Sequence, residues 1–328
     1  MGQTQEMDSI GLRRRGMMAG LLAAPLAARA QTWPAGPLRI IVPFGPGGST
    51  DIMGRLLASG LSPSVGVPVL VENRGGAATA MGTELAAHAA PDGQNWMVTS
   101  DSFAVLPALM PRLAVDVMRD FAPVTLIASA PNVIAVHPSR PWRSLAEIIA
   151  AARGGQLSYA STGNGTTGHL AMTRFCAALG IRMAHAAYRS GGLALNDSVA
   201  GHVDMIIGSA ALLAPQIADG RLRPVVQLST ARLPALDNVQ TSAEAGFADF
   251  LAETWWGVLG PARTPASAIA AMLEAVRAVF RDERIAGQVT QTQQARLRLD
   301  GPEAMRDFLQ GQVDSWGAVI RQHGISAD

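Results

Sequence analysis

The sequence predicts an α/β protein with two domains, each an open, mainly parallel β-sheet flanked by helices. Strand-like and helix-like segments alternate along the chain, and the alternation begins again near residue 130. Such alternation is typical of parallel strands joined by right-handed helical crossovers. The length of 328 residues, with 48% hydrophobic and 16% charged side chains, is sufficient for two hydrophobic cores.

The first series of elements begins with "LRIIV" (38–42), whose apolar, β-branched residues between two prolines predict a buried strand. Ser49 or Thr50 is expected to cap a helix that ends near residue 61, with Asp51 in its first turn, where a negative charge suits the helix dipole. A strand, a helix and another strand are expected to follow at 67–73, 77–90 and 95–100.

The second series has the same alternating pattern. Ser144 and Glu147 have the spacing of a capping box and open its first helix. The expected strands are 132–138, 156–161, 183–188, 203–209 and 223–229, and the expected helices are 144–153, 167–179, 190–202 and 211–220.

The last part of the chain predicts one strand and two helices. "ETWWGVLGP" (253–261) is the strand. Its two tryptophans could form an aromatic pair in a cleft, but strand alternation buries one of them in any case, and packing in the core is expected. Thr264-Pro265 opens one helix, and Gly301-Pro302 opens the other, which ends at Gly324. The expected domains are residues 31–129 together with 249–328 as domain 1, and residues 130–248 as domain 2. Loops and helix starts gather at the carboxyl ends of parallel strands, so we expect a ligand cleft between the domains.

The first thirty residues have the pattern of an export signal. Three arginines (13–15) precede a short apolar run, and Ala28-Arg29-Ala30 forms an A-x-A site, which places cleavage after Ala30. The arginine pair also resembles a twin-arginine signal, so either export route remains open. The protein is therefore expected in the periplasm, with residues 1–30 removed.

Composition excludes several classes of function. Loss of residues 1–30 removes four arginines and two acidic residues, so the formal net charge falls from +1 to −1, and no basic footprint for nucleic acid remains. The chain has no lysine, which excludes a P-loop and Schiff-base chemistry. The single cysteine, Cys176, lies in an apolar helical segment and is expected to be buried and unreactive. No metal-binding or hydrolase motif is present, so neither a cofactor nor a metal is expected.

Gly163-Asn164-Gly165-Thr166-Thr167-Gly168 has the G-x-G-x-x-G spacing between a strand and a helix. A dinucleotide site also needs an acidic residue about twenty positions later, and residues 183–192 contain none. The glycines and the N–H groups at the helix start favour a negatively charged group of another kind. The loop 43–51 repeats the arrangement in the first series, and two such loops that lack arginine suit a small carboxylate.

Several long segments resemble one known family. They are "PLRIIVPFGPGGSTDIMGRLLASGLS", "PVLVENRGGAATAMGTELAAHAAPDGQNWMV", "FAPVTLIASAPNVIAVHPS", "LSYASTGNGTTGHLAM" and "AGHVDMIIGS". They are similar to the substrate-binding proteins of tripartite tricarboxylate transporters, the Bug family of periplasmic receptors. The resemblance covers nearly all of the chain after residue 30. It implies a two-domain, type II periplasmic-binding-protein-like fold that closes on a small organic acid, without catalysis.

The resemblance also implies where the ligand is held. The loop 43–51 is expected to hold it partly through waters, and the segment 161–169 to bind carboxylate oxygens directly. Asp51 is alternatively a first-turn charge only, and His169 is expected to brace its loop more than to touch the ligand. The candidate ligand contacts are Phe44, Gly47, Ser49, Asp51, Ser100, Asp101, Ser102, Thr162, Asn164, Gly165, Thr166, Thr167, His169 and Ser209.

The chain departs from the family pattern at places that bear on the ligand. After the third strand the family has a sequence like G-T-S-G, whereas this chain has Val98-Thr99-Ser100-Asp101. An F-D-N-like segment of the family is replaced by Ile206-Ile207-Gly208-Ser209. We therefore expect Asp101 to face an amine or hydroxyl group of the ligand.

Three functions remain open on the sequence alone. The first is a monomeric receptor for a small organic acid that works with inner-membrane transporter subunits. The second is a sensory receptor that passes the same ligand signal to a signalling partner. The third is an exported hydrolase whose catalytic residues meet only in space.

Overall fold

The computed structural model describes residues 33–326, apart from 77–78 and 189. The expected export signal and its cleavage site lie outside the described residues. Within the described part, no helix is both long and apolar enough to cross a membrane. The elements up to the long fourth strand are β1 (Leu38–Val42), α1 (Ser49–Val65), β2 (Val69–Asn73), α2 (Ala80–Ala87), β3 (Asn95–Ser100), α3 (Ser102–Leu109) and β4 (Phe121–Val136). The next are α4 (Leu145–Gly154), β5 (Leu157–Ser161), α5 (Thr167–Leu179), β6 (Met183–Ala187), α6 (Gly191–Val199), β7 (Met205–Ser209), α7 (Ala210–Ala218) and β8 (Arg223–Gln227). The chain ends with β9 (Glu253–Pro261), α8 (Ala266–Val279), α9 (Glu283–Thr292), β10 (Arg296–Leu297) and α10 (Pro302–His323).

The α/β architecture is confirmed, but the sheet is mixed rather than mainly parallel. Its strands follow the order β2-β1-β3-β9-β4-β7-β5-β6, and β8 and β10 also pair with β4. The pairs of β1 with β2 and β3, and of β5 with β6 and β7, are parallel as expected. Every strand that pairs with β4 is antiparallel to it. The reason is that the chain passes between the two series through extended strands and not through a helical crossover.

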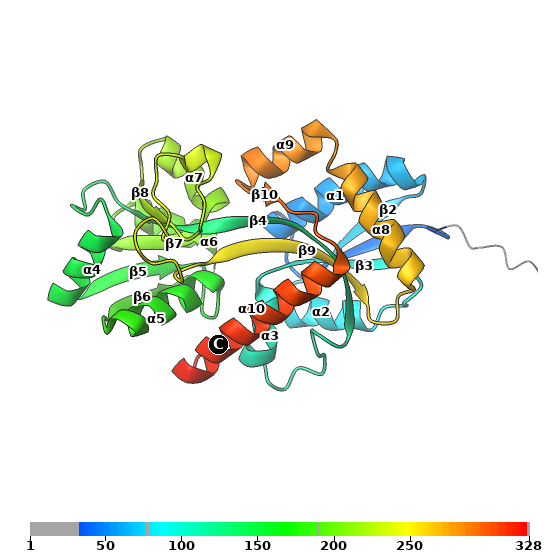
Figure 1. The fold of residues 1–328 in the computed structure, drawn as a ribbon, viewed down its shortest axis with the longest axis horizontal. Coiled ribbons are helices and arrows are strands. Elements are labelled where there is room, and N and C mark those ends of the chain that lie inside the picture. Colours follow the sequence, from blue (N-terminus) through cyan, green and yellow to red (C-terminus); the bar gives the residue numbers. More distant parts are fainter. Residues whose placement is uncertain (1–32, 77–78, 189, 327–328) are drawn as a thin grey trace, which may run out of the picture.

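The long strand β4 runs through both halves of the sheet (Figure 1). Residues 121–131 pair with β9, and residues 132–136 pair with β7 and β8. Sequence analysis predicted only the second part, because Pro123 and Pro131 interrupt the first. The structure accommodates Pro123 beside a register shift in the pairing with β9. The predicted domain boundaries near residues 129 and 249 stay a prediction.

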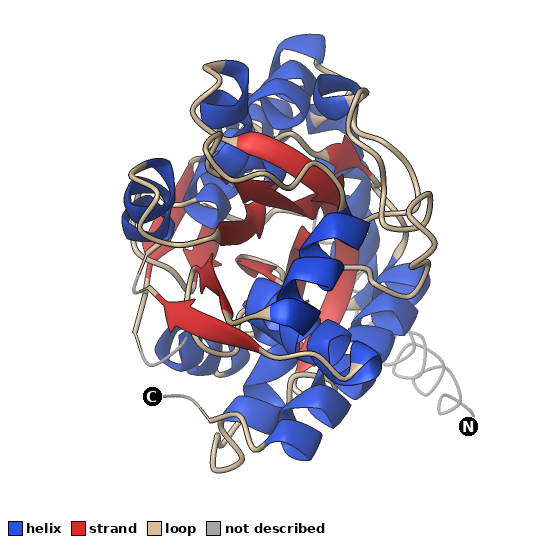
Figure 2. Ribbon diagram, turned by 90° about the vertical axis from the view of Figure 1, so that its left-hand side faces the viewer, coloured by secondary structure: helices blue, strands red, loops and turns tan. Residues whose placement is uncertain are grey.

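Helices lie on both faces of the sheet (Figure 2). Apolar side chains fill the layers between the sheet and these helices. Trp255 and Trp256 are both fully buried, as expected, and strand alternation sends them to opposite faces. Trp256 belongs to the cluster that contains Met272 of α8, and Trp255 belongs to the cluster that contains Met305 of α10. Its ring meets Phe308 edge to face, with centroids 5.6 Å apart.

The last helix, α10, crosses from one half of the molecule to the other (Figure 1). Met305 near its start is buried with the core around β3, whereas Trp316 near its end is buried with the core around β5. The guanidinium of Arg174 on α5 lies 4.9 Å from the centroid of the Trp316 ring and donates to the backbone oxygens of Asp249 and Leu251. This helix therefore contacts both halves of the sheet.

Helix ends follow the sequence signals in most places. The Ser144 hydroxyl accepts a hydrogen bond from the Glu147 N–H, so the predicted cap of α4 is present. In a full capping box the Glu147 carboxylate would accept a hydrogen bond from the N–H of Ser144. Here it accepts from the N–H of Arg143, one residue earlier. Gly324 takes a left-handed conformation and ends α10 as predicted.

Candidate functional site

The carboxyl ends of β3 and β7 point toward each other across the middle of β4. Ser100 at the end of β3 pairs with Trp256 of β9, and Trp256 pairs on its other side with Ala128 of β4. Ser209 at the end of β7 is opposite Asn132 of β4. Asn132 follows Ala128 by four positions, which is about 13 Å along β4. Because β1 is parallel to β3 and β5 is parallel to β7, the loops after all four strands approach this crossing.

The loop between β1 and α1 is held by a buried carboxylate. Asp51 accepts hydrogen bonds from the Gly47 N–H at 2.8 Å and from Asn73 Nδ2 at 2.9 Å, and Arg55 Nε lies 3.0 Å away. Asn73 Nδ2 also donates to the Phe44 oxygen. Burial by itself raises the pKa of Asp51, but the bonds from Arg55, Gly47 and Asn73 outweigh it, and the pKa is lowered. The Asp51 carboxylate is thus ionised and bonded to donors of the chain itself, so it shapes the loop.

The start of α1 offers backbone donors beside this loop. Its N-cap is Gly48 and not Ser49 or Thr50, so the predicted side-chain cap was wrong, because the helix begins one residue earlier and Gly48 has no side chain to cap it. The first N–H bonded within the helix region is that of Ile52, to the Gly48 oxygen. The N–H groups of residues 49–51 have no partner within the helix and favour a negative group. Ser49 is half-buried here, and Gly47 is exposed with φ +85°.

The start of α5 is built in a similar way. Its N-cap residue Thr166 does not cap the helix, because its hydroxyl donates to the Gly163 oxygen at 2.8 Å. The Leu170 N–H bonds to the Thr166 oxygen at 2.9 Å. The N–H groups of Thr167 and Gly168 precede that bond and have no acceptor within the helix. The structure therefore leaves donors at the start of α5 for an anion.

A stack of rings supports the loop before α5. The Gly165 N–H donates to His169 Nδ1 at 3.0 Å, which agrees with the expectation that His169 braces the loop. The His169 ring stacks on His185 with centroids 4.0 Å apart, and His185 stacks on Tyr159 at 4.9 Å. His185 Nε2 lies 2.7 Å from Ser161 Oγ. Burial lowers the pKa of His185, which favours its neutral form.

Ser161 and His185 have the composition of a nucleophile and its base. The Ser161 side chain is fully buried, however, and its hydroxyl is also within bonding distance of the Gly163 oxygen and N–H. A nucleophile has to reach a substrate, and this hydroxyl instead fixes the backbone of the loop. The pair gives no support to the hydrolase alternative.

The lowered pKa of His185 predicts an acid-sensitive stability. The unfolded chain binds a proton at this residue near pH 6.5, whereas the folded protein resists it, so stability is lost as the pH falls below about 6.5. We expect the melting temperature of the wild type to fall more steeply between about pH 7.5 and 5.5 than that of His185→Gln. A His323→Gln control, at an exposed position on α10, reports the effect of losing a histidine. Parallel profiles for wild type and His185→Gln would contradict the prediction.

Asp101 connects the two loops that sequence analysis assigned to different domains. Its Oδ2 accepts a hydrogen bond from the hydroxyl of Thr167, the first residue of α5. Asp101 is the N-cap of α3, yet its side chain makes no bond to that helix. The residue keeps some exposed surface, but its carboxyl group is enclosed, and burial raises its pKa against the opposing hydrogen bonds. The side chain is thus turned inward toward α5, as the hypothesis of a ligand-facing Asp101 requires.

A second contact fixes α3 against the same loop. A Cβ atom on Gly165 would lie 2.6 Å from Leu109 Cδ1, so this glycine permits a close approach of the loop to α3. Gly165 also has φ +70°, in the left-handed region that favours glycine. The loop position of Gly165 therefore depends on the absence of a side chain.

The remaining candidate contacts differ in their surroundings. Ser100 is buried, and Ser102 Oγ is buried without a hydrogen-bond partner in the described structure. Thr162 lies against the start of α6, and Asn164 is exposed. Ser209 caps α7 by accepting from the Leu212 N–H at 3.4 Å, so its hydroxyl already has a structural partner.

Several residues of this region were not found by sequence analysis. The helix α3 was missed, because Pro107 lies within eight residues that have no polar face. Asn73 ends β2 beside β1, and a polar residue at the carboxyl end of a parallel strand is a signal that could have been used. Leu109 and His185 meet the loop only through tertiary packing, for which the local sequence gives no signal.

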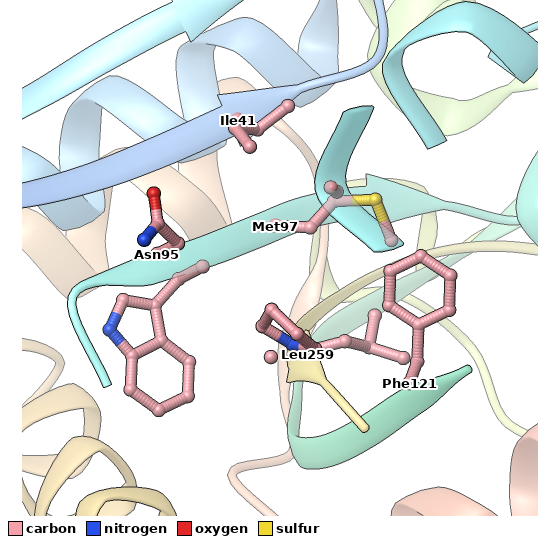
Figure 3. A pocket seen from close by; sticks show the side chains of 9 residues that line it. Ile41, Asn95, Met97, Phe121 and Leu259 are labelled. Carbon is pink, nitrogen blue, oxygen red and sulfur yellow. The ribbon is translucent and has the colours of Figure 1, made fainter. Parts of the chain in front are cut away.

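Three hollows lie away from the predicted ligand contacts. The small one in Figure 3 lies near the start of β3, among Ile41, Asn95, Met97, Phe121 and Leu259, and leaves no room for a water molecule. Another, of about 430 Å³, lies beside Asp120 and Arg263. The third, of about 470 Å³, lies between α2 and residues 109–113 and shares Leu109 with the contact described above. None of the three is lined by a predicted ligand contact, and no metal-binding cluster of His, Cys, Asp or Glu occurs in the described ranges.

The half-buried Cys176 is set apart from this chemistry. Burial raises the pKa of its thiol to about 11, which keeps it protonated near neutral pH. It packs against the core around β5, in agreement with the sequence interpretation.

Comparisons with a family model, with related sequences and with solved structures all indicate the same family. The family described as "Tripartite tricarboxylate transporter family receptor" matches residues 53–325. Protein BugT of Bordetella pertussis is 33% identical, over 92% of this chain and 93% of that protein. The structure of Rpa4515 from R. palustris with adipate is 27% identical, with a TM-score of 0.79 over 90% of this chain and 99% of that one. MatC (Rpa3494) from Rhodopseudomonas palustris with bound malate is 25% identical, with a TM-score of 0.75 over 88% of this chain and 100% of that one.

Proposed function

This chain belongs to the tripartite tricarboxylate transporter receptor family, and from this premise we propose that it is a periplasmic receptor that captures a small organic acid between its two halves. The ligand carboxylate binds at the start of α5, and the start of α1 faces it from the other half. Capture is stoichiometric and involves no turnover. The relatives bound to adipate and malate support a carboxylate as the ligand class.

One observation carries this proposal beyond family membership. The starts of α1 and α5 have no side-chain cap, and the strands before them, β1 and β5, run toward each other from the two halves of the sheet. Uncapped backbone N–H groups and the helix dipole favour a negative charge without any basic side chain. Since neither loop contains arginine, a carboxylate fits this site better than a phosphate.

The wider role follows from the same proposal. Residues 31–129 with 249–328 form one domain and residues 130–248 the other, and the two close on the ligand. The mature protein begins after Ala30, is a monomer in the periplasm, and delivers its ligand to inner-membrane subunits of a tripartite tricarboxylate transporter.

A thermal-shift screen of the mature protein tests the proposal. The ligands are mono-, di- and tricarboxylates, aromatic acids and amino acids, with nucleotides as the competing class. A ligand that binds only the folded state raises the melting temperature by mass action. We expect at least one organic acid to raise it and no nucleotide to do so. If a nucleotide raises it and no acid does, the proposed function is wrong.

The loop before α5 gives a mutational prediction. Asn164→Ala is expected to weaken binding of the acid identified in the screen by about tenfold, since one hydrogen bond to a charged group contributes about 1.5–3 kcal/mol. Thr166→Ala is expected to weaken binding indirectly, because the Thr166 hydroxyl gives its one proton to the Gly163 oxygen and so holds the shape of the loop. Loss of this hydrogen bond is expected to lower the stability of the protein by about 1 kcal/mol. Isothermal titration and thermal unfolding measure the two effects.

A matched control separates an effect on binding from the general effect of losing a side-chain hydroxyl bond. Ser144→Ala removes the cap of α4, far along the chain from this loop, and has a similar cost in stability. It is expected to leave the affinity for the acid unchanged. Equal affinities for Thr166→Ala, Asn164→Ala and wild type would place the ligand elsewhere.

A further inference from the structure

Asp101 makes an unusual bond for a residue at a helix start. An aspartate at an N-cap normally accepts from N–H groups of its own helix. Here the carboxyl group leaves α3 uncapped and accepts instead from the Thr167 hydroxyl on α5. An acidic side chain of the first half thus lies at the helix start that we assign to the ligand carboxylate.

The surroundings of this carboxyl group lack a compensating charge. Burial is the largest influence on the pKa of Asp101 and raises it. Hydrogen bonds from Thr167, the backbone and Ser100 oppose this effect, and no cation of the described residues contributes. The group is therefore an enclosed acceptor whose only counterparts are hydroxyl and N–H groups.

A second carboxylate beside Asp101 is unfavourable. Two negative charges at contact distance in a partly desolvated site repel strongly, so a second carboxylate can lie against Asp101 only when one of the two groups holds a proton. A hydroxyl or amine group can donate to Asp101 and has no such repulsion. The enclosed carboxyl group consequently distinguishes acids by their second functional group, which is a carboxylate in one class and a hydroxyl or amine in the other.

We propose that Asp101 is the specificity-determining residue of the site, and that it selects acids with one carboxylate and a hydrogen-bond donor over dicarboxylates. This inference rests on the proposed function and names its substrate class. The ligand carboxylate binds at the N–H groups that begin α5, and its hydroxyl or amine group donates to Asp101. Ser102 Oγ, buried without a partner in the described structure, is one residue away and can contact the same group.

Calorimetric titration with matched pairs of acids tests the inference. The pairs are γ-hydroxybutyrate with succinate, γ-aminobutyrate with succinate, and hydroxybenzoate with terephthalate, because each pair differs in a single functional group. For wild type we expect the acid with the donor group to bind about tenfold or more tightly than its dicarboxylate partner. In Asp101→Asn, which keeps an oxygen acceptor for Thr167 but removes the acidic group, this ratio should fall by about tenfold.

Asp101→Glu is the matched control, because it keeps the acidic group and should still disfavour dicarboxylates. Thermal unfolding without ligand shows whether each variant is folded. A wild type that prefers the dicarboxylates, or an unchanged ratio in Asp101→Asn, would overturn the role of Asp101 while leaving the receptor intact. If no acid of the broad screen binds to wild type or variants, the proposed function fails and the inference fails with it.

Discussion

Replacement of Trp256 by alanine is expected to lower the stability of the protein by about 3–5 kcal/mol, the range measured for large aromatic residues in cores. Trp256 is fully buried and lies level with Ser100 of β3 on one side and Ala128 of β4 on the other. Its removal opens a cavity where the sheet passes from one half to the other. Thermal unfolding should show a melting temperature lower by on the order of 10 °C.

Trp256→Phe provides the control for this experiment. The indole nitrogen of Trp256 is buried without a hydrogen-bond partner in the described structure, so phenylalanine removes volume but breaks no bond. We expect its stability loss to be well under half that of the alanine variant. Equal losses for the two variants would show that the polar nitrogen, and not the volume, stabilises this position.

Local patterns in the sequence were sufficient for most elements and for the two glycine-rich loops before α1 and α5. The strand at 38–42, the strand at 253–261 and the cap of α4 at Ser144 were all predicted from residue types alone. These features depend on short-range physics, since β-branched runs, glycines and capping side chains act on their own neighbours. The helix starts of α1 and α5 could be placed for the same reason.

The features that were missed depend on contacts between distant residues. The mixed sheet follows from pairing of β4 with β9, which are more than one hundred positions apart, and nothing in "FAPVTLIASAP" indicates that partner. Asp51 could be read as a first-turn charge or a ligand contact until its bonds to Asn73 and Gly47 were seen. Asp101 was recognised as a departure from the family pattern, but only the fold shows that it reaches Thr167. Whether these residues touch the ligand is still a prediction.

Gly165→Ala is expected to abolish most of the ligand binding while the protein stays folded. A residue other than glycine at φ +70° costs about 1–2 kcal/mol, and the new Cβ would be 2.6 Å from Leu109 Cδ1. Leu109 is itself buried, so the loop has to move, and with it the Gly165 N–H that bonds to His169. Loss of one or two donors to a carboxylate corresponds to roughly a 10- to 100-fold lower affinity, measurable by calorimetry with the acid from the screen.

Gly180→Ala separates backbone strain from the effect on the site. Gly180 follows the last residue of the same helix with φ +62°, and a Cβ there would meet no atom within 4 Å. The control thus has a similar conformational cost without the contact to α3, and its ligand affinity should equal that of wild type. If the collision with Leu109 is the cause, the double variant Gly165→Ala with Leu109→Ala recovers part of the affinity that Gly165→Ala loses. Wild-type affinity in Gly165→Ala would mean that the start of α5 does not hold the carboxylate, because a binding loop cannot shift away from its ligand and keep the same donors in place.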